Sequence, residues 1–334
     1  MSRITVFKFF LIFLVVFPCF SLKPYDLHFS VEPFFSYSKG SVNEYLYDND
    51  ETNRLLSKLE WDRNIFMYGA KSKLKFWRLG LETSIASSIP ASCGKMQDSD
   101  WMNERVPDMK TTYSVGTNNA CENYDASILF SFDFYPFNSP EQEQFIFSVF
   151  MQFQYLHDLF ERKKAEGWYG QWDHTSDGKN HWWYEDEAAH YPYTYWNEGK
   201  GKNVTLKLAG ISYEIDTLSI FLGGNFSVRI GEKINIDLGL AFAPFSYTET
   251  TDIHHGSERK ITGSQQNFWN QFKCSLKSAI CLTSRIETTL ELSTAYSQIS
   301  KGSFYIYGEK DRFHNTGSNH FSVTATTGIR FRIF

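Results

Sequence analysis

The last fifteen residues before the C-terminus, HFSVTATTGIRFRIF, alternate between apolar and polar side chains. Successive side chains of a β-strand point to opposite faces, so this period of two predicts a strand with one apolar face. Its other face is polar and carries Arg330 and Arg332. In a β-sandwich the apolar face would lie in the core, whereas in a membrane barrel it would face lipid and the arginines would line a wet interior. The alternation alone allows both arrangements.

Charged side chains on the polar faces of other segments favour the barrel. Lys273 and Lys277 alternate with apolar residues in one segment, and Glu287 and Glu291 do so in the next. Buried charges must be paired, and such a charged interior suits a small barrel far better than the core of a sandwich. Ten alternating segments can be counted, at about 26–48, 55–75, 78–96, 122–136, 143–168, 196–230, 234–250, 262–281, 285–300 and 319–334.

The connections between these segments alternate between short and long. Short turns are expected near residues 77, 136–140, 231–233 and 283, and longer polar loops at 49–54, 97–121, 169–195, 251–261 and 301–318. Short turns at one end and long loops at the other are typical of outer-membrane proteins. The sequence therefore predicts an all-β fold, a ten-stranded antiparallel transmembrane β-barrel with long extracellular loops.

The N-terminus has the features of a secretory signal peptide. Arg3 and Lys8 precede an apolar run that ends near Ser21, too short for a membrane-spanning helix. We therefore expect a signal peptide at residues 1–21 and an outer-membrane barrel domain at residues 22–334. Aromatic residues make up 18% of the chain, as the interfacial girdles of such a barrel require. The net charge of −5 argues against a nucleic-acid partner.

Cysteine and histidine positions leave several options open. Cys93 and Cys121 flank a predicted loop and could form a disulfide in an oxidising compartment, whereas Cys274 and Cys281 are expected to be free thiols. The loop at 169–195 is rich in Trp, Tyr and His. Its histidines match no metal-binding spacing, and an exposed aromatic loop that contacts lipid headgroups or a partner is the favoured interpretation. These three histidines are His174, His181 and His190.

Two polar segments at strand ends carry paired functional groups. Asp98 and Asp100 are two residues apart, so their side chains share one face of an extended strand. Two neighbouring carboxylates titrate as a coupled pair and can hold a water or a proton. Asp252 and His254 have the same spacing, and an aspartate there can orient an imidazole as a general base. Together they supply a base, its orienting acid and a second acidic group.

The residues around these pairs resemble the omptin family, ten-stranded outer-membrane endopeptidases of Gram-negative bacteria. The segment DSDWM at 98–102 is similar to one family motif, and D-I-H at 252–254 followed by RKIT at 259–262 is similar to another. Residues 38–61, SKGSVNEYLYDNDETNRLLSKLEW, resemble the first hairpin of the family. The three matches occur in the family's order.

The resemblance implies a peptidase that uses a water nucleophile and forms no covalent intermediate. His254, oriented by Asp252, would take a proton from a water held by Asp98, and Asp100 would help to position the reacting group. The resemblance also places Glu44 in a pocket for a basic substrate side chain and Met96 in the wall of that pocket. The resemblance implies no metal or organic cofactor. The partners that it implies for the protein are peptide or protein substrates outside the cell and outer-membrane lipid. We further expect a monomer in the cell outer membrane, with the active site facing outside.

Three positions depart from the family's pattern. Thr250 stands where many omptins have a second pocket acid, which predicts a weaker preference for basic residues. Phe268 stands where the family offers a lysine to lipopolysaccharide, so a lipopolysaccharide requirement is left open. Phe334 is the expected terminal aromatic residue but is out of register with Phe331 and Ile333.

Three alternative functions fit parts of the pattern. A non-proteolytic surface barrel, acting as an adhesin or host-protein receptor, would keep the fold but has no need for the four catalytic candidates. A porin is disfavoured because the lumen of a ten-stranded barrel is filled by side chains. A calcium or zinc site at the rim would have to combine Asp98, Asp100, His254 and His255, a mixture of hard and soft ligands that fits neither metal well.

Overall fold

The computed structural model describes residues 27–102, 107–108, 110–134, 145–169, 171–174, 180–183, 202–206, 210–256 and 258–333. All regular elements within these ranges are β-strands. No helix in this part of the chain is long and apolar enough to cross a membrane. The predicted signal peptide, the turn at 136–140, Phe334 and most of the aromatic loop lie outside the described residues.

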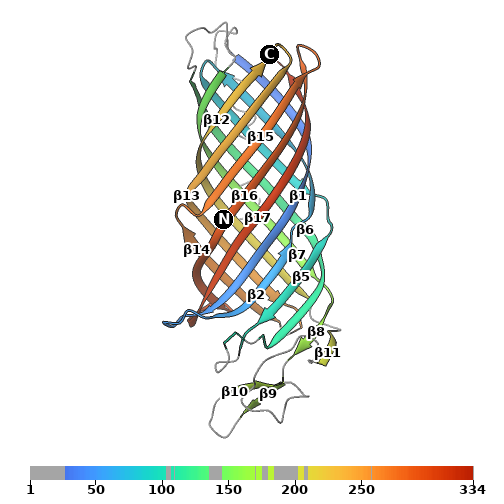
Figure 1. Cartoon of the computed structure of the whole chain (residues 1–334), viewed down its shortest axis with the longest axis vertical. Coiled ribbons are helices and arrows are strands. Elements are labelled where there is room, and N and C mark those ends of the chain that lie inside the picture. Colours follow the sequence, from blue (N-terminus) through green and yellow to red (C-terminus); the bar gives the residue numbers. More distant parts are fainter. Residues whose placement is uncertain are drawn as a thin grey trace.

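The long strands form one antiparallel sheet that closes on itself (Figure 1). The first and last strands pair with each other, and the pairing of β6 with β7 completes the ring. Three rows of the wall are each interrupted once, between β2 and β3, β4 and β5, and β14 and β15. When each interrupted row is counted once, the ring has ten rows, so the predicted barrel is confirmed. The strands of the wall are β1 (Leu27–Asp48), β2 (Leu55–Asp62), β3 (Ile65–Phe76), β4 (Leu79–Ser88), β5 (Ala91–Asp100), β6 (Thr112–Phe134), β7 (Phe145–Arg162), β12 (Ile211–Ile230), β13 (Ile234–His254), β14 (Arg259–Asn267), β15 (Gln271–Cys281), β16 (Ile286–Ile306) and β17 (Glu309–Arg332).

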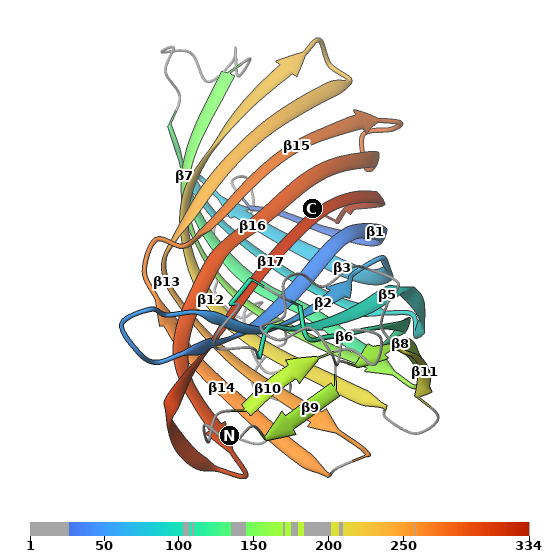
Figure 2. The same ribbon diagram turned by 60° about the horizontal axis from the view of Figure 1, so that its bottom comes forward.

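Four short strands extend one side of the wall beyond the ring. The strand β8 (Ala165–Tyr169) pairs with the end of β6 and with β11 (Lys202–Leu206). A separate two-stranded hairpin consists of β9 (Gln171–His174) and β10 (Asn180–Trp183). Figure 2 shows these strands at the end of the barrel that also carries β2 and β5.

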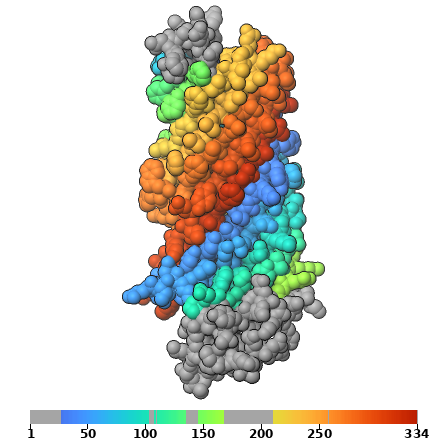
Figure 3. All heavy atoms as spheres, in the orientation of Figure 1, coloured from blue at the N-terminus to red at the C-terminus, as the bar shows by residue number. Residues whose placement is uncertain are grey.

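One half of the barrel's outer surface is apolar. Phe35 on β1, Phe242 on β13 and Leu290 on β16 are each more than half exposed, as lipid-facing side chains must be. The three strand interruptions mark one border of this band, and β2, β5 and β14 lie beyond it. Figure 3 shows the strands of the wall packed side by side without a gap on the visible face, with β17 next to β1.

The interior of the apolar half carries paired charges, as the alternation predicts. Lys277 Nζ lies 3.2 Å from Glu32 Oε1, and Arg330 Nη2 lies 2.8 Å from Glu32 Oε2. Lys71 Nζ on β3 lies 2.8 Å from Glu291 Oε2 on β16. Lys71, Lys277, Glu291 and Arg330 line a cavity of about 410 Å³ inside the barrel. The lumen is therefore polar and its charges compensate one another.

The loops predicted at 97–121, 251–261 and 301–318 are largely strands, so their predicted lengths are wrong. Shorter connections remain, at 101–111, 255–258 and 307–308. These strand ends lie beyond the apolar band, where both faces can carry polar residues, so the alternation that marks a strand is lost there. The barrel wall therefore continues well past the band before the chain turns.

Cys93 and Cys121 are both free, so the disulfide that the sequence allowed does not form. Each lies at a β-bulge in the pairing of its strand, where the register shifts. Cys93 is buried and its thiol donates to the Asp62 carbonyl, whereas Cys121 Sγ faces Glu161 Oε2. Cys274 and Cys281 are also free, as expected.

Candidate functional site

An aromatic stack closes the barrel where it leaves the apolar band. Trp61 on β2 stacks on Tyr213 of β12, with ring centroids 5.7 Å apart, and on Phe160 of β7 at 6.0 Å. All three rings are fully buried. Such stacked pairs add to the burial of the aromatic rings. We call this stack the floor, because the cross-strand partners of its rings, Met96 and Asp252, begin the two segments at the mouth of the barrel.

The first acidic pair stands on β5, next to this floor. Met96 is the cross-strand partner of Trp61, and Asp98 and Asp100 follow on the same face of the strand. Ladders with β2 and β6 hold β5 on both sides, so the two carboxylates have fixed positions. Hydrogen bonds from the Ser57 and Thr112 hydroxyls reach Asp100. The structure thus places Met96 and both aspartates together at the mouth.

The histidine pair stands on β13. Asp252 is the cross-strand partner of Tyr213 in the floor, and His254 lies one step farther along the same face. The Nε2 atom of His254 is 2.7 Å from Asp252 Oδ2, a short bond between an imidazole and a carboxylate. Asp252 is buried, while the His254 side chain is 31% exposed and reaches the open mouth. The buried carboxylate of Asp252 therefore orients the imidazole of His254, and the mouth leaves that imidazole accessible to a ligand.

The Asp98–Asp100 pair and the Asp252–His254 pair lie close enough across the mouth for their charges to interact. Burial and the Asp100 carboxylate raise the pKa of Asp98 to about 7, although Arg162 and His254 oppose the rise. Burial also raises the pKa of Asp100, against the hydrogen bond from Ser57. Burial lowers the pKa of His254, but the Asp252 hydrogen bond and charge outweigh it and leave that pKa raised. One proton can therefore reside on the Asp98–Asp100 pair near neutral pH.

Glu44 lies beside these groups. It is buried on β1, and burial with the charges of Asp252 and Asp98 raises its pKa well above the usual range. Its Oε2 atom and the Oγ1 atom of buried Thr250 have no hydrogen-bond partner among the described residues. Buried polar atoms of this kind are rare in folded proteins and call for a ligand or water. Glu44 and Thr250 can accept a donor from a bound molecule.

Arg162 is a site residue that the sequence analysis missed. This buried cation at the end of β7 donates through Nη1 to Ser114 Oγ at 2.9 Å, and its Nη1 lies 3.0 Å from Met96 Sδ. Gly116 provides space for it, because a Cβ there would come within 3.0 Å of the arginine side chain. The alternation of residues 143–168 puts Arg162 on the same face as Phe160, which is the signal that could have found it.

The rim metal site that the sequence allowed does not assemble. His254 is the last residue of β13, whereas His255 begins the following turn and contacts Ser212, which alternates with the inward-facing Tyr213 and so lies on the opposite face of the wall. His255 Nε2 is 2.6 Å from Ser212 Oγ and is exposed. Only His254 faces Asp98 and Asp100, so the four ligands do not converge.

Comparisons with known proteins agree with this architecture. A model of the Omptin family matches residues 27–169. The crystal structure of the outer membrane protease OmpT from Escherichia coli has a TM-score of 0.71 at 14% identity, and the match covers 95% of this chain and 99% of that chain. A search of curated protein sequences found no match.

Two other barrels give much lower scores. The translocator domain of the autotransporter NalP from Neisseria meningitidis has a TM-score of 0.34 at 7% identity, covering 94% of this chain and 90% of that chain. The toluene transporter TodX from Pseudomonas putida has a TM-score of 0.28 at 7% identity, covering 92% of this chain and 90% of that chain.

The resemblance noted in the sequence is thus confirmed by the family match and by the fold. The match includes Glu44, Met96, Asp98 and Asp100, whereas Asp252 and His254 lie in the part of the chain that it does not cover. The described barrel thus has the fold of the outer membrane protease OmpT, and its residues 27–169 match the model of the Omptin family.

Proposed function

We propose that this protein is an endopeptidase of the cell surface that cleaves peptide bonds with a water nucleophile. The observation that carries the proposal is the 2.7 Å bond between His254 and Asp252, directed at a mouth that also holds Asp98 and Asp100. A histidine oriented by a buried carboxylate is the arrangement that a general base needs. The acidic pair opposite supplies a second place for a proton.

In the proposed mechanism a water lies between His254 and Asp98. Neutral His254 removes a proton from the water, and the oxygen attacks the carbonyl carbon of the scissile bond. Asp252 stabilises the imidazolium that forms, as carboxylates do for catalytic histidines. A protonated Asp98–Asp100 pair donates a hydrogen bond to the carbonyl oxygen as negative charge develops there. His254 then gives its proton to the leaving amine, which breaks the bond and restores the base.

Glu44 and Met96 are proposed to shape the substrate pocket. A lysine or arginine side chain of the substrate would lie against Glu44, whose Oε2 atom lacks a partner among the described residues. The arriving cation would favour the ionised form of this buried acid, since an opposite charge lowers the pKa of a carboxyl group. Thr250 offers a hydroxyl but no second charge, so the pocket should prefer basic residues without requiring them.

The mouth is proposed to face outside the cell. The described end of β17, near the C-terminus, lies at the opposite end of the barrel (Figure 1). The buried stack of Trp61, Phe160 and Tyr213 below the site supports a surface enzyme rather than a pore, because large side chains fill the interior there. We propose that the protein acts as a monomer on peptides or exposed protein segments.

The test displays the full chain on cells that lack surface proteases and supplies a library of quenched peptides. Mass spectrometry of the products then gives the cleaved bonds. The proposal predicts cleavage by the wild type and none by His254→Ala, with equal amounts of both barrels in the outer membrane. If the two cell types leave the library equally intact, the protein is instead a surface barrel of the adhesin or receptor type.

A further inference from the structure

A second cluster of ionisable side chains lies on the outer wall of the barrel, away from the proposed catalytic groups. His157 on β7 is the cross-strand partner of Asp216 on β12, and Glu214 lies two residues from Asp216 on the same face. Leu156, Asp158, Ile215 and Thr217, the neighbours of these residues along both strands, line the lumen. Since side chains alternate across a strand, the cluster faces outward. It lies just beyond the border of the apolar band.

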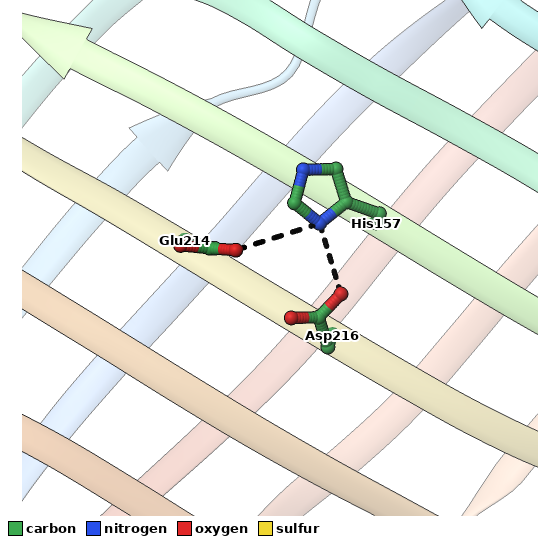
Figure 4. Close-up of side chains that lie close together, drawn as sticks. All are labelled: His157, Glu214 and Asp216. Carbon is green, nitrogen blue, oxygen red and sulfur yellow. Dashed lines mark hydrogen bonds and ion pairs between the residues drawn. The ribbon is translucent and has the colours of Figure 1, made fainter. Parts of the chain in front are cut away.

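Three potential ligand atoms converge within this cluster. His157 Nδ1 is 2.9 Å from Asp216 Oδ1 and 3.9 Å from Glu214 Oε1, and all three atoms lie within 4.8 Å of one another. Figure 4 shows the imidazole nitrogen directed between the two carboxylates. A zinc ion with bonds of about 2.0 to 2.2 Å holds neighbouring ligand atoms about 3.4 Å apart at the tetrahedral angle. The observed spacings of 2.9 and 3.9 Å bracket this value.

The histidine and the aspartate are held in place before any ligand arrives. The His157 ring is only 2% exposed and stacks on Tyr124, with ring centroids 5.8 Å apart. The Tyr155 hydroxyl donates to Asp216 Oδ1 at 2.5 Å. Outer hydrogen bonds of this kind orient metal-binding carboxylates. The Glu214 and Asp216 side chains are 25% and 34% exposed, so an ion from solvent can reach their carboxylates.

The cluster differs from an ordinary histidine–carboxylate pair. His314 and Asp311 form such a pair at 3.0 Å, with one carboxylate on one ring nitrogen. At His157, two carboxylates from the same strand approach one nitrogen, and the buried Nε2 atom on the other side of the ring has no hydrogen-bond partner among the described residues. Among the described residues, His157, Glu214 and Asp216 form the group of three or more His, Cys, Asp or Glu side chains that could hold a metal ion.

We propose that His157, Glu214 and Asp216 form a binding site for a divalent transition-metal ion on the outer wall of the barrel. One imidazole nitrogen with two carboxylate oxygens suits zinc, because magnesium and calcium prefer oxygen ligands alone. The ion would join β7 to β12, the two strands that carry Phe160 and Tyr213 of the floor. It would thus brace the wall behind the proposed active site without taking part in peptide cleavage. The resemblance to omptins implied no metal, so this site lies outside what the family predicts.

The test uses the purified full chain in detergent, stripped with a chelator and titrated with zinc sulfate by calorimetry. Cobalt chloride gives a second readout, since its visible absorption reports nitrogen and oxygen ligands. The wild type should bind one zinc per chain at this site. The variants Asp216→Asn and Glu214→Gln, which keep the side-chain shapes, should bind it roughly tenfold or more weakly. His157→Ala should lose both the heat of binding and the cobalt spectrum.

Two controls locate the site. His314→Ala removes a histidine–aspartate pair of ordinary type and should bind zinc as the wild type does. A triple alanine variant of His174, His181 and His190 removes the histidines of the aromatic loop and should also bind normally. Unchanged binding in Asp216→Asn and Glu214→Gln, loss of binding in either control, or no binding by the wild type in excess zinc would each overturn the proposal. A failure here leaves peptide cleavage untouched, because cleavage is measured separately.

Discussion

The bond between Asp252 and His254 leads to a prediction about protonation that does not depend on turnover. An ordinary histidine has a pKa of about 6.5. Asp252 raises the pKa of His254 above this value, against the opposing effect of burial, so its imidazole should stay protonated to a higher pH. The substitution Asp252→Asn keeps the shape of the side chain and removes the charge. We therefore expect the pKa of His254 to fall in this variant.

The size of the shift follows from the contact. A hydrogen bond to a charged group contributes ~1.5 to 3 kcal/mol, and one pKa unit corresponds to ~1.4 kcal/mol. His254 is 31% exposed, so solvent screening places the effect at the lower end, about 1.5 kcal/mol. A general base must be neutral, so the activity of the wild type should fall as the pH drops through this raised pKa. The acid limb should lie at lower pH in any residual activity of Asp252→Asn.

Histidine NMR in detergent micelles measures the shift directly, with chain labelled at the imidazole carbons. His254→Ala assigns the resonance, and His255, which contacts Ser212 instead of Asp252, serves as the internal control. An unchanged pKa of His254 in Asp252→Asn would refute the view that this carboxylate supports the base.

Four further predictions concern the site and the fold. Asp98→Asn, Asp100→Asn and His254→Ala should each lower kcat/KM for a quenched peptide by orders of magnitude, and their combinations should be less than additive because the groups act together. Glu44→Gln should largely remove any preference for Lys or Arg in a cleavage profile, while Thr250→Asp should increase it by about tenfold, the value of ~1.4 kcal/mol for an added ion pair. Trp61→Ala should destabilise the barrel by about 3 to 5 kcal/mol, measured by the loss of the folded band on unheated gels as denaturant is raised, because it leaves a cavity in the floor. The wild type should fractionate with outer membranes and change its gel mobility on heating, and recovery as a soluble periplasmic protein would contradict the membrane assignment.

The barrel could be predicted because its determinants are local. Alternation is visible wherever one strand face meets lipid and the other meets the lumen, as at Phe331 and Arg330, and the inward charges pair as expected. Beyond the apolar band this signal disappears, so the outer parts of β6, β13 and β17 were assigned to loops. The bulges at Cys93 and Cys121 were also invisible, because a one-residue shift in register depends on the partner strand.

The candidate site was only partly accessible from sequence. The spacing of Asp98 and Asp100, and of Asp252 and His254, placed each pair on one face of a strand, but the spacing does not bring the two pairs together; only the resemblance to omptins assigned them to one site. Arg162 was missed because its role depends on Met96 and Ser114, which reach it from other strands. The outward cluster at His157 was missed for the same reason, since Asp216 becomes its neighbour only through the register of β7 and β12.

The central claim is that His254 acts as the base for water in an endopeptidase. The most direct test compares kcat/KM for one quenched peptide between His254→Ala and His255→Ala, both purified in detergent and checked for folding by gel mobility. His255 is the adjacent histidine on the opposite face of the wall, so its loss controls for the local change in chain and charge. The account predicts near-normal cleavage by His255→Ala and a loss of three orders of magnitude or more in His254→Ala, within the range that general base catalysis contributes (roughly 10²- to 10⁴-fold). Equal cleavage by the two variants would contradict it.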